Sequence, residues 1–130
     1  MKTILVVEDD AKLARLYRQE LGDEGYRVRH ADNGLEALQR VEQDAVDLVV
    51  MDINLPGING LETLSRMLEV QPRLRVVINS SFGCYQDDFT SWAADAYVVK
   101  SSDLTELKAR IAEVLALAEP DVAGQALLTG

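Results

Sequence analysis

Short runs of consecutive apolar residues alternate along the chain with stretches in which apolar residues recur every three or four positions. The short runs are rich in valine, leucine and isoleucine. Continuous apolar character of this kind is typical of strands that are covered on both faces, as in a parallel sheet. The pattern predicts strands at residues 3–7, 27–31, 47–51, 74–79 and 95–99, of which the second and the last carry the weaker signal.

The stretches between these runs carry apolar stripes at helical spacing. They predict helices around residues 13–21, 37–41, 61–68 and 104–118. A fifth helix at 86–94 has the least regular stripe, since only Phe89, Trp92 and Ala93 contribute to it. Glycine and proline signals such as Gly25 and Pro72 separate the elements, as expected at turns.

Five strand–helix units in about 118 residues predict one α/β domain, an open, doubly wound parallel sheet with helices on both faces. We expect this domain to cover residues 1–118, and residues 119–130 to form a tail or the start of a linker. Whether the chain acts alone or as part of a larger regulator stays open. Sheets of this kind bind ligands at the carboxyl ends of their strands, so the residues that follow each strand are the first candidates for a site.

The composition of the chain excludes or disfavours several classes of binding partner and of structural site. The chain has 130 residues, 13 basic and 22 acidic, and a formal net charge of −9, which disfavours non-specific binding to nucleic acid or to an anionic membrane. No apolar run reaches the ~20 residues of a membrane span. A single cysteine, Cys84, excludes an internal disulfide framework and a multi-cysteine zinc site. We expect a cytoplasmic protein with no direct contact to nucleic acid or membrane.

Acidic residues follow two of the predicted strands. Glu8, Asp9 and Asp10 come after residues 3–7, and Asp52 comes after residues 47–51. If these strands are neighbours, their carboxylates lie close together. Mg²⁺ prefers such hard oxygen ligands and keeps several bound waters, so the sequence predicts a Mg²⁺ site here. Capping of the next helix is the alternative role, and for Asp10 the two roles stay equally open.

A hydroxyl and an amine follow the last two strands. Ser80 comes directly after the run at 74–79, and Lys100 comes after residues 95–99. Taken singly, such a lysine is usually solvated and such a serine usually forms a turn. Together with a cation site they match what phosphoryl transfer onto Asp52 requires. The carboxylate is then the nucleophile, while the metal, Lys100 and Ser80 stabilise charge on the phosphoryl oxygens.

Four segments carry a resemblance to a known family: ILVVEDD at 4–10, DLVVMDINLPGING at 47–60, VVINSSFG at 76–83 and AYVVKS at 96–101. In this order and spacing the chain resembles a bacterial response-regulator receiver domain over residues 2–118. The resemblance implies a flavodoxin-like sheet with strand order 2-1-3-4-5. It also implies a signalling switch that takes phosphate, with Mg²⁺, from the phosphohistidine of a sensor histidine kinase or phosphotransfer protein.

The resemblance also implies roles for individual residues. Asp52 falls on the phosphoacceptor, and Glu8 and Asp9 fall on the acidic pair that holds the metal, Asp9 directly and Glu8 through water. Asn54 would offer its backbone carbonyl to the metal.

The remaining roles concern the signal itself. Ser80 falls on the hydroxyl that moves toward the phosphoryl group, Lys100 on the amine, and Tyr97 on the ring that then turns inward. The surface formed by residues 86–118 would repack and recruit a downstream protein target, an effector domain or, as a homodimer, a second copy.

One departure from the family concerns Ser101, because the family usually has proline there, joined by a cis peptide bond. A cis bond to a residue other than proline costs about 2.5–4 kcal/mol, so we expect a trans bond and a displaced Lys100. His30 lies within the strand at 27–31, where we expect it to be structural or exposed and away from the metal site.

Other functions remain to be weighed. A degenerate receiver would act by constitutive protein–protein binding. A phosphatase with an aspartyl nucleophile would need Asp-x-Asp after its first strand, whereas Asp52 follows the third. Flavodoxin-like cofactor binding is opposed by the acidic run Glu8-Asp9-Asp10, which would repel a flavin phosphate.

Overall fold

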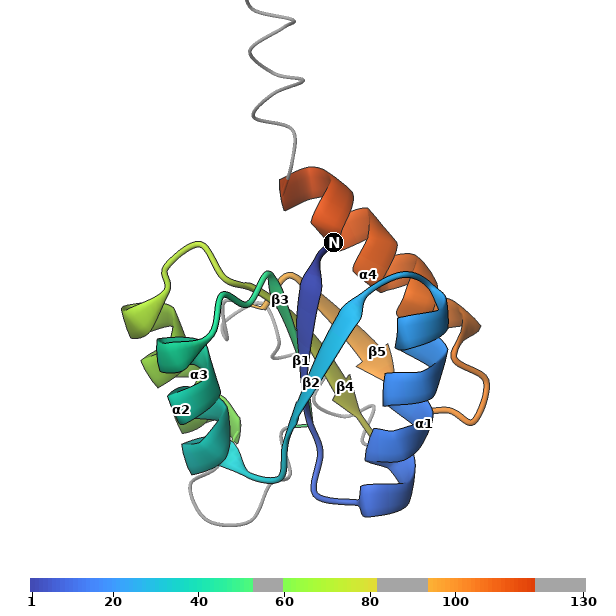
Figure 1. Cartoon of the computed structure of the whole chain (residues 1–130), viewed down its shortest axis with the longest axis horizontal. Helices are drawn as coiled ribbons and strands as arrows, with labels where there is room; N and C mark the ends of the chain where they lie inside the picture. Colours follow the sequence, from blue (N-terminus) through green and yellow to red (C-terminus); the bar gives the residue numbers. More distant parts are fainter. Residues whose placement is uncertain (53–59, 82–93, 119–130) are drawn as a thin grey trace, which may run out of the picture.

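The computed structural model describes residues 1–52, 60–81 and 94–118. Its centre is one sheet of five parallel strands in the order β2-β1-β3-β4-β5 (Figure 1). The strands are β1 (Thr3–Val7), β2 (Arg27–Ala31), β3 (Leu48–Met51), β4 (Arg75–Ser80) and β5 (Ala96–Val99). The doubly wound α/β fold and the strand order that the resemblance implied are both confirmed.

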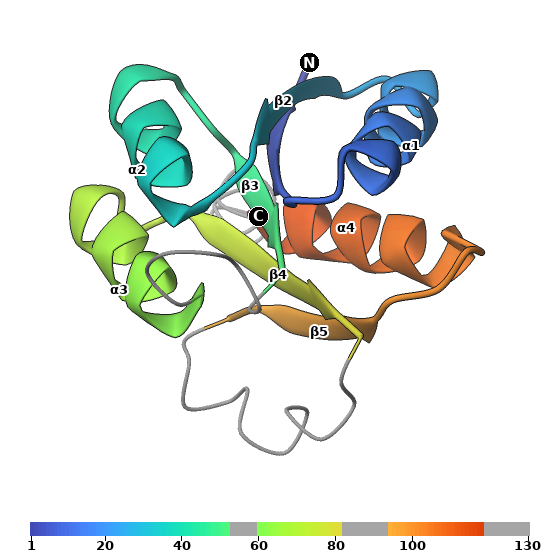
Figure 2. The same ribbon diagram turned by 90° about the horizontal axis from the view of Figure 1, so that it is seen from below.

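Helices cover both faces of this sheet. They are α1 (Ala11–Asp23), α2 (Gly34–Gln43), α3 (Gly60–Val70) and α4 (Thr105–Ala118). Helices α1 and α4 lie on one face and α2 and α3 on the other, as Figure 2 shows most clearly. The four predicted helices with regular stripes are confirmed, whereas the fifth, predicted at 86–94, lies outside the described residues except for its last position. No helix in the described part of the chain is long and apolar enough to cross a bilayer.

Local signals set the helix ends. Asp10 caps α1, because its Oδ1 accepts hydrogen bonds from the backbone N–H groups of Lys12 and Leu13 at 2.9 and 3.2 Å. Asn33 caps α2 in the same way through the N–H of Glu36, at 2.9 Å. Gly25 takes a φ of 97° after α1, a left-handed conformation that favours glycine. Capping is therefore the observed role of Asp10.

The core forms two apolar layers, one on each face of the sheet. In β1, Leu5 and Val7 pack toward α2 and α3, whereas Ile4 and Val6 pack toward α1 and α4, and all four are almost fully buried. The continuous apolar run of β1 therefore does mean burial on both faces. Strand β2 is different, because it lies at an edge of the sheet and its residues alternate between exposed and partly buried.

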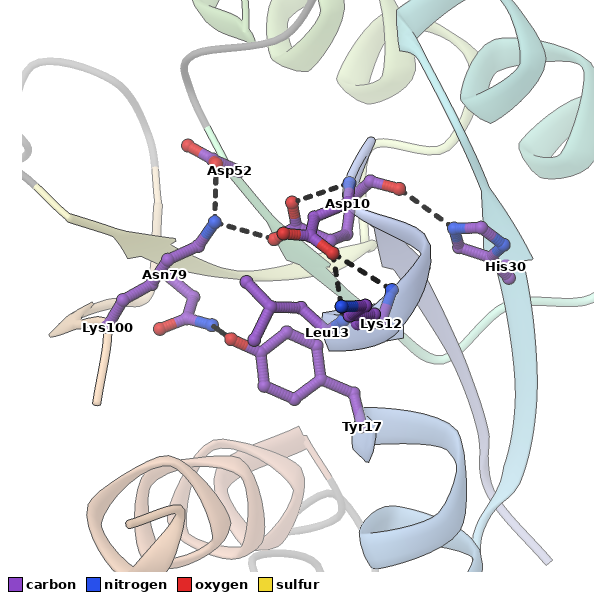
Figure 3. Close-up of polar contacts among 9 residues, drawn as sticks. Asp10, Lys12, Leu13, Tyr17, His30, Asp52, Asn79 and Lys100 are labelled. Carbon is purple, nitrogen blue, oxygen red and sulfur yellow. Dashed lines mark hydrogen bonds and ion pairs between the residues drawn. The ribbon is translucent and has the colours of Figure 1, made fainter. Parts of the chain in front are cut away.

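One polar pair interrupts the layer between the sheet and α1. The Nδ2 group of Asn79, in β4, donates a hydrogen bond of 3.1 Å to the hydroxyl oxygen of Tyr17, in α1 (Figure 3). The two residues are only 3% and 1% exposed, and burial raises the pKa of Tyr17. The bond ties the helix that follows the acidic residues to the position just before Ser80.

We expect Tyr17→Phe to lower the free energy of unfolding by about 2 kcal/mol, because it leaves a buried amide donor without its partner. Combining it with Asn79→Leu removes both polar groups and should recover part of this loss. Urea denaturation of the single and double variants measures both effects. Tyr26→Phe is the control, on a partly exposed tyrosine whose hydroxyl has no hydrogen bond to the described residues. Equal effects at the two tyrosines would contradict the prediction.

Candidate functional site

The acidic residues predicted from the strand ends do come together. Strands β1 and β3 are neighbours with Val7 opposite Met51, so the next residues, Glu8 and Asp52, leave the sheet side by side. One carboxylate oxygen from each of Glu8, Asp9 and Asp52 lies within 4.8 Å of the others. Glu8 and Asp52 are 2% and 7% exposed, whereas Asp9 is exposed. The fold thus concentrates negative charge at the carboxyl edge of the sheet.

Lys100 supplies the positive charge of the site. Its backbone N–H donates to the carbonyl of Ser80 at 2.8 Å, which fixes the start of the segment after β5. Its Nζ lies 2.6 Å from Glu8 Oε1 and 2.7 Å from Asp52 Oδ2 (Figure 3). The bond between Lys100 and Ser101 is trans, as expected, since the described residues contain no cis peptide bond. The expected displacement of Lys100 is wrong, because the long side chain still reaches both carboxylates.

Burial and charge act in opposite senses on this group of residues. Burial raises the pKa of Glu8, and the hydrogen bond from Lys100 offsets this only in part. Burial alone would lower the pKa of Lys100, but the hydrogen bonds and negative charges of Asp52 and Glu8 outweigh it and raise that pKa to about 12. The amine is therefore charged at any physiological pH.

The donor set suits a hard divalent cation. Three carboxylates and one ammonium group leave a net charge of −2 when all are ionised. Mg²⁺ prefers such oxygen ligands and keeps several waters, and exposed Asp9 leaves the cluster accessible to solvent. Asn54, the remaining predicted ligand, lies outside the described residues.

The predicted switch residues lie on the same two strands. Ser80 ends β4 and is fully buried, with Val99 opposite it in β5. Tyr97 lies opposite Ile78, two positions before Ser80, and is buried in the layer beneath α2 and α3. Both residues make further polar or ring contacts. Ser80 and Tyr97 thus lie on neighbouring strands, so a movement of the Ser80 side chain can affect the packing of the Tyr97 ring.

The structure adds contacts that the sequence did not indicate. His30 Nε2 lies 2.8 Å from the backbone carbonyl oxygen of Glu8, and 3.4 Å from Asp32 Oδ1. His30 is therefore nearer to the acidic residues than expected, but its contact is to the main chain of Glu8, and it is not part of the carboxylate cluster. The reason is the pairing of β1 with β2, in which the Glu8 N–H donates to the Ala31 carbonyl. Glu8 Oε2 also accepts a hydrogen bond of 3.1 Å from the Asp10 N–H, which orients the buried carboxylate.

The residues beneath the site were also missed. Asn79 stands in the apolar run VVINS, and a polar residue there was the available signal that its side chain needs a buried partner. That the partner is Tyr17 follows only from the packing of α1 on β4.

Comparison with known proteins agrees with this geometry. The profile of the response regulator receiver domain family matches residues 4–112. The uncharacterized transcriptional regulatory protein YkoG of Bacillus subtilis is 37% identical over 114 residues, which cover 86% of this chain and 50% of that protein. The chain spans about half the length of the curated relatives it matches.

Solved structures give the same result. The response regulator TrrA of Thermotoga maritima, in complex with Mg²⁺–BeF, is 39% identical, with a TM-score of 0.83 over 88% of this chain and 99% of that one. TrrA in complex with the histidine kinase ThkA is 40% identical, with a TM-score of 0.81 and the same coverage. Such receiver domains are regulatory modules of two-component systems rather than turnover enzymes. The chain therefore belongs to the response-regulator receiver domain family.

Proposed function

We propose that this domain accepts a phosphoryl group on Asp52, with Mg²⁺, from the phosphohistidine of a sensor histidine kinase or phosphotransfer protein. The convergence of Glu8, Asp9, Asp52 and Lys100 at one edge of the sheet is the observation that carries the proposal. TrrA, which is similar over most of this chain, was solved both with Mg²⁺–BeF and with its histidine kinase, and these complexes support the choice of cofactor and donor.

The chain's own groups define the transfer. A carboxylate oxygen of Asp52 attacks phosphorus, the new O–P bond forms as the P–N bond to the donor histidine breaks, and the electron pair returns to the imidazole nitrogen. Glu8, Asp9 and Asp52 would hold the Mg²⁺, with the Asn54 carbonyl as a further ligand, and the bound ion would neutralise charge on the phosphoryl oxygens. Beyond its own phosphorylation and slow self-dephosphorylation, the domain has no turnover activity in this proposal.

Lys100 has a different role before and after transfer. Before transfer its ammonium group balances Glu8 and Asp52, which are both largely buried. A phosphoryl group adds up to about two negative charges at the same place, and the ammonium can pair with one of its oxygens. Lys100 would thus stabilise the site both before phosphorylation, by pairing with the carboxylates, and after it, by pairing with the phosphoryl group.

The signal would leave the site through β4 and β5. Ser80 would donate its hydroxyl to a phosphoryl oxygen, and Tyr97 would adjust its packing in response, which favours one of two arrangements of the surface to which β5 and α4 contribute. Residues 86–93, which the sequence assigns to the same surface, lie outside the described residues. A downstream target, an effector domain or a second copy of the domain would bind that altered surface. Constitutive binding by a degenerate receiver is the alternative, and the contact of Lys100 with both carboxylates argues against it.

Phosphorylation is tested most directly by intact mass after incubation with Mg²⁺ and a small acyl-phosphate donor. We expect the mass of one phosphoryl group to be gained, and the gain to be abolished by Asp52→Asn or by a chelator, because both remove an essential part of the acceptor. Asp23→Asn, at the exposed end of α1, is the matched control and should be modified like the parent. A parent protein that gains no mass under these conditions would contradict the proposal.

Magnesium binding should depend on Asp9 and on pH. Asp9→Asn is expected to weaken Mg²⁺ at least about tenfold without lowering stability, since it removes both a ligand and a repelling charge. Because burial raises the pKa of Glu8, affinity should fall as the pH drops through that raised pKa and Glu8 takes up a proton.

Titration calorimetry at several pH values measures both effects on magnesium. Asp10→Asn is the control, because asparagine caps a helix as well as aspartate does and Asp10 is not in the carboxylate cluster. Equal losses of affinity at positions 9 and 10 would contradict the assignment.

Removing the amine should destabilise the metal-free domain. Lys100→Met leaves Glu8 and Asp52 buried without their cation, and we expect a loss of about 3 kcal/mol near neutral pH. The loss should shrink as the pH is lowered, because protonation of the two carboxylates removes their repulsion. Urea denaturation across the acidic range tests this, with Lys108→Met, whose ion pair to Glu20 is more exposed, as the milder control.

A further inference from the structure

The outer edge of β2 pairs with no strand of the described residues. The strand ends the sheet on one side, and Figures 1 and 2 show that edge between α1 and α2, with no other labelled strand beside it. The Arg27 N–H donates to Lys2, and the Ala31 carbonyl accepts from Glu8, so these residues face β1. Backbone groups alternate along a strand, so those of Val28 and His30 point outward. Such an edge is a template for an added strand.

Positive charge gathers along this edge although the chain carries a net charge of −9. Arg15 and Arg18 project from α1, and Arg27 and Arg29 from β2, and all four are exposed. The ion pairs of the described residues include none of them. Unpaired like charges side by side repel one another, so this arrangement does not stabilise the isolated domain.

Two hollows lie along the edge, one beside α1 and one that extends from α1 to α2. The hollow beside α1, of about 380 Å³, is lined by Tyr26 and Val28 together with Arg15 and Arg18. Its floor is apolar, since Tyr26 and Val28 pack against the core layer beneath α1 and α4.

The hollow beside α2, of about 280 Å³, is polar. It contains Arg18, Arg29 and Arg40 together with His30. Its two carboxylates are already engaged, Asp32 with His30, and Glu36 with the backbone N–H of Asp32. Arg18 and Val28 line both hollows, so the two form one trench along β2.

We propose that the β2 edge binds an extended segment of a partner protein in which acidic and apolar residues alternate. Side chains of an added strand point alternately to the two faces of the sheet. Its apolar residues would then enter the hollow with Tyr26 and Val28, and its acidic residues would face Arg29. Arg40, in the same hollow, already lies 3.9 Å from Asp44 and would add to the positive field. The backbone of the segment would pair with Val28 and His30, a mode of recognition known as strand addition.

The charge balance favours this occupant over other polyanions. A nucleic acid or an anionic membrane extends far beyond the trench and meets the repulsion of the whole acidic domain. A short acidic segment feels mainly the local field of the arginines, because salt screens charges more than about 8–10 Å away. The residues that line the trench do not include Glu8, Asp9, Asp52 or Lys100, so the proposal does not depend on phosphorylation.

The test uses a short peptide that alternates glutamate with valine, titrated into the ¹⁵N-labelled full chain. We expect amide shifts along β2, slower hydrogen exchange at Val28 and His30, and weaker binding at high salt. Arg29→Glu should weaken binding roughly fivefold, because it removes an exposed charge pair and adds a repelling carboxylate, and Arg29→Lys should largely retain it. Arg73→Glu, the same charge change on the exposed turn before β4, should leave binding unchanged.

A second peptide with the same residues arranged as a glutamate block and a valine block separates strand addition from charge alone. It should bind distinctly more weakly, because its side chains cannot match the two faces. Equal binding of the two peptides, no shifts along β2, or an Arg29→Glu variant that binds like the parent would overturn the proposal. Comparable binding of a single-stranded DNA oligonucleotide through the same residues would overturn it as well.

Discussion

The contact of one ammonium group with two buried carboxylates is the constraint on which the site depends. Glu8 and Asp52 are nearly inaccessible to water, and two such charges side by side would repel strongly without Lys100. The contact requires the ends of β1, β3 and β5 to meet at one edge, with β4 between the last two. Strand order and charge balance are therefore linked, because an order of parallel strands that moved β5 further from β1 and β3 would separate the amine from the acids.

Lys100 neutralises only part of the negative charge of the carboxylate cluster. The negative charge that remains is what would allow the site to bind a divalent cation. With Asp9 included, the cluster keeps two uncompensated negative charges, which a divalent cation can neutralise. Beneath the site, Asp10 caps α1, and Tyr17 on that helix is bonded to Asn79 in β4. These contacts hold α1 against the strand that carries Ser80.

The acidic cluster and the exposed arginines lie at different edges of the sheet. The carboxyl edge of the sheet holds the acids and their amine, whereas the outer edge of β2 holds exposed arginines that pair with none of the described residues. The net charge of −9 does not reveal this separation, because it is a sum over both regions. Local charge, not the total, determines what each surface can bind.

By itself the sequence determined which segments become strands and helices, and that Glu8, Asp9, Asp52 and Lys100 follow strands, because periodicity and capping act between residues close in the chain. Periodicity left the order of the strands open, and only the family resemblance supplied it. The tertiary structure alone decided that Lys100 reaches both carboxylates across the sheet and that His30 lies against Glu8. Such contacts depend on register and side-chain direction between distant segments, which no local pattern encodes.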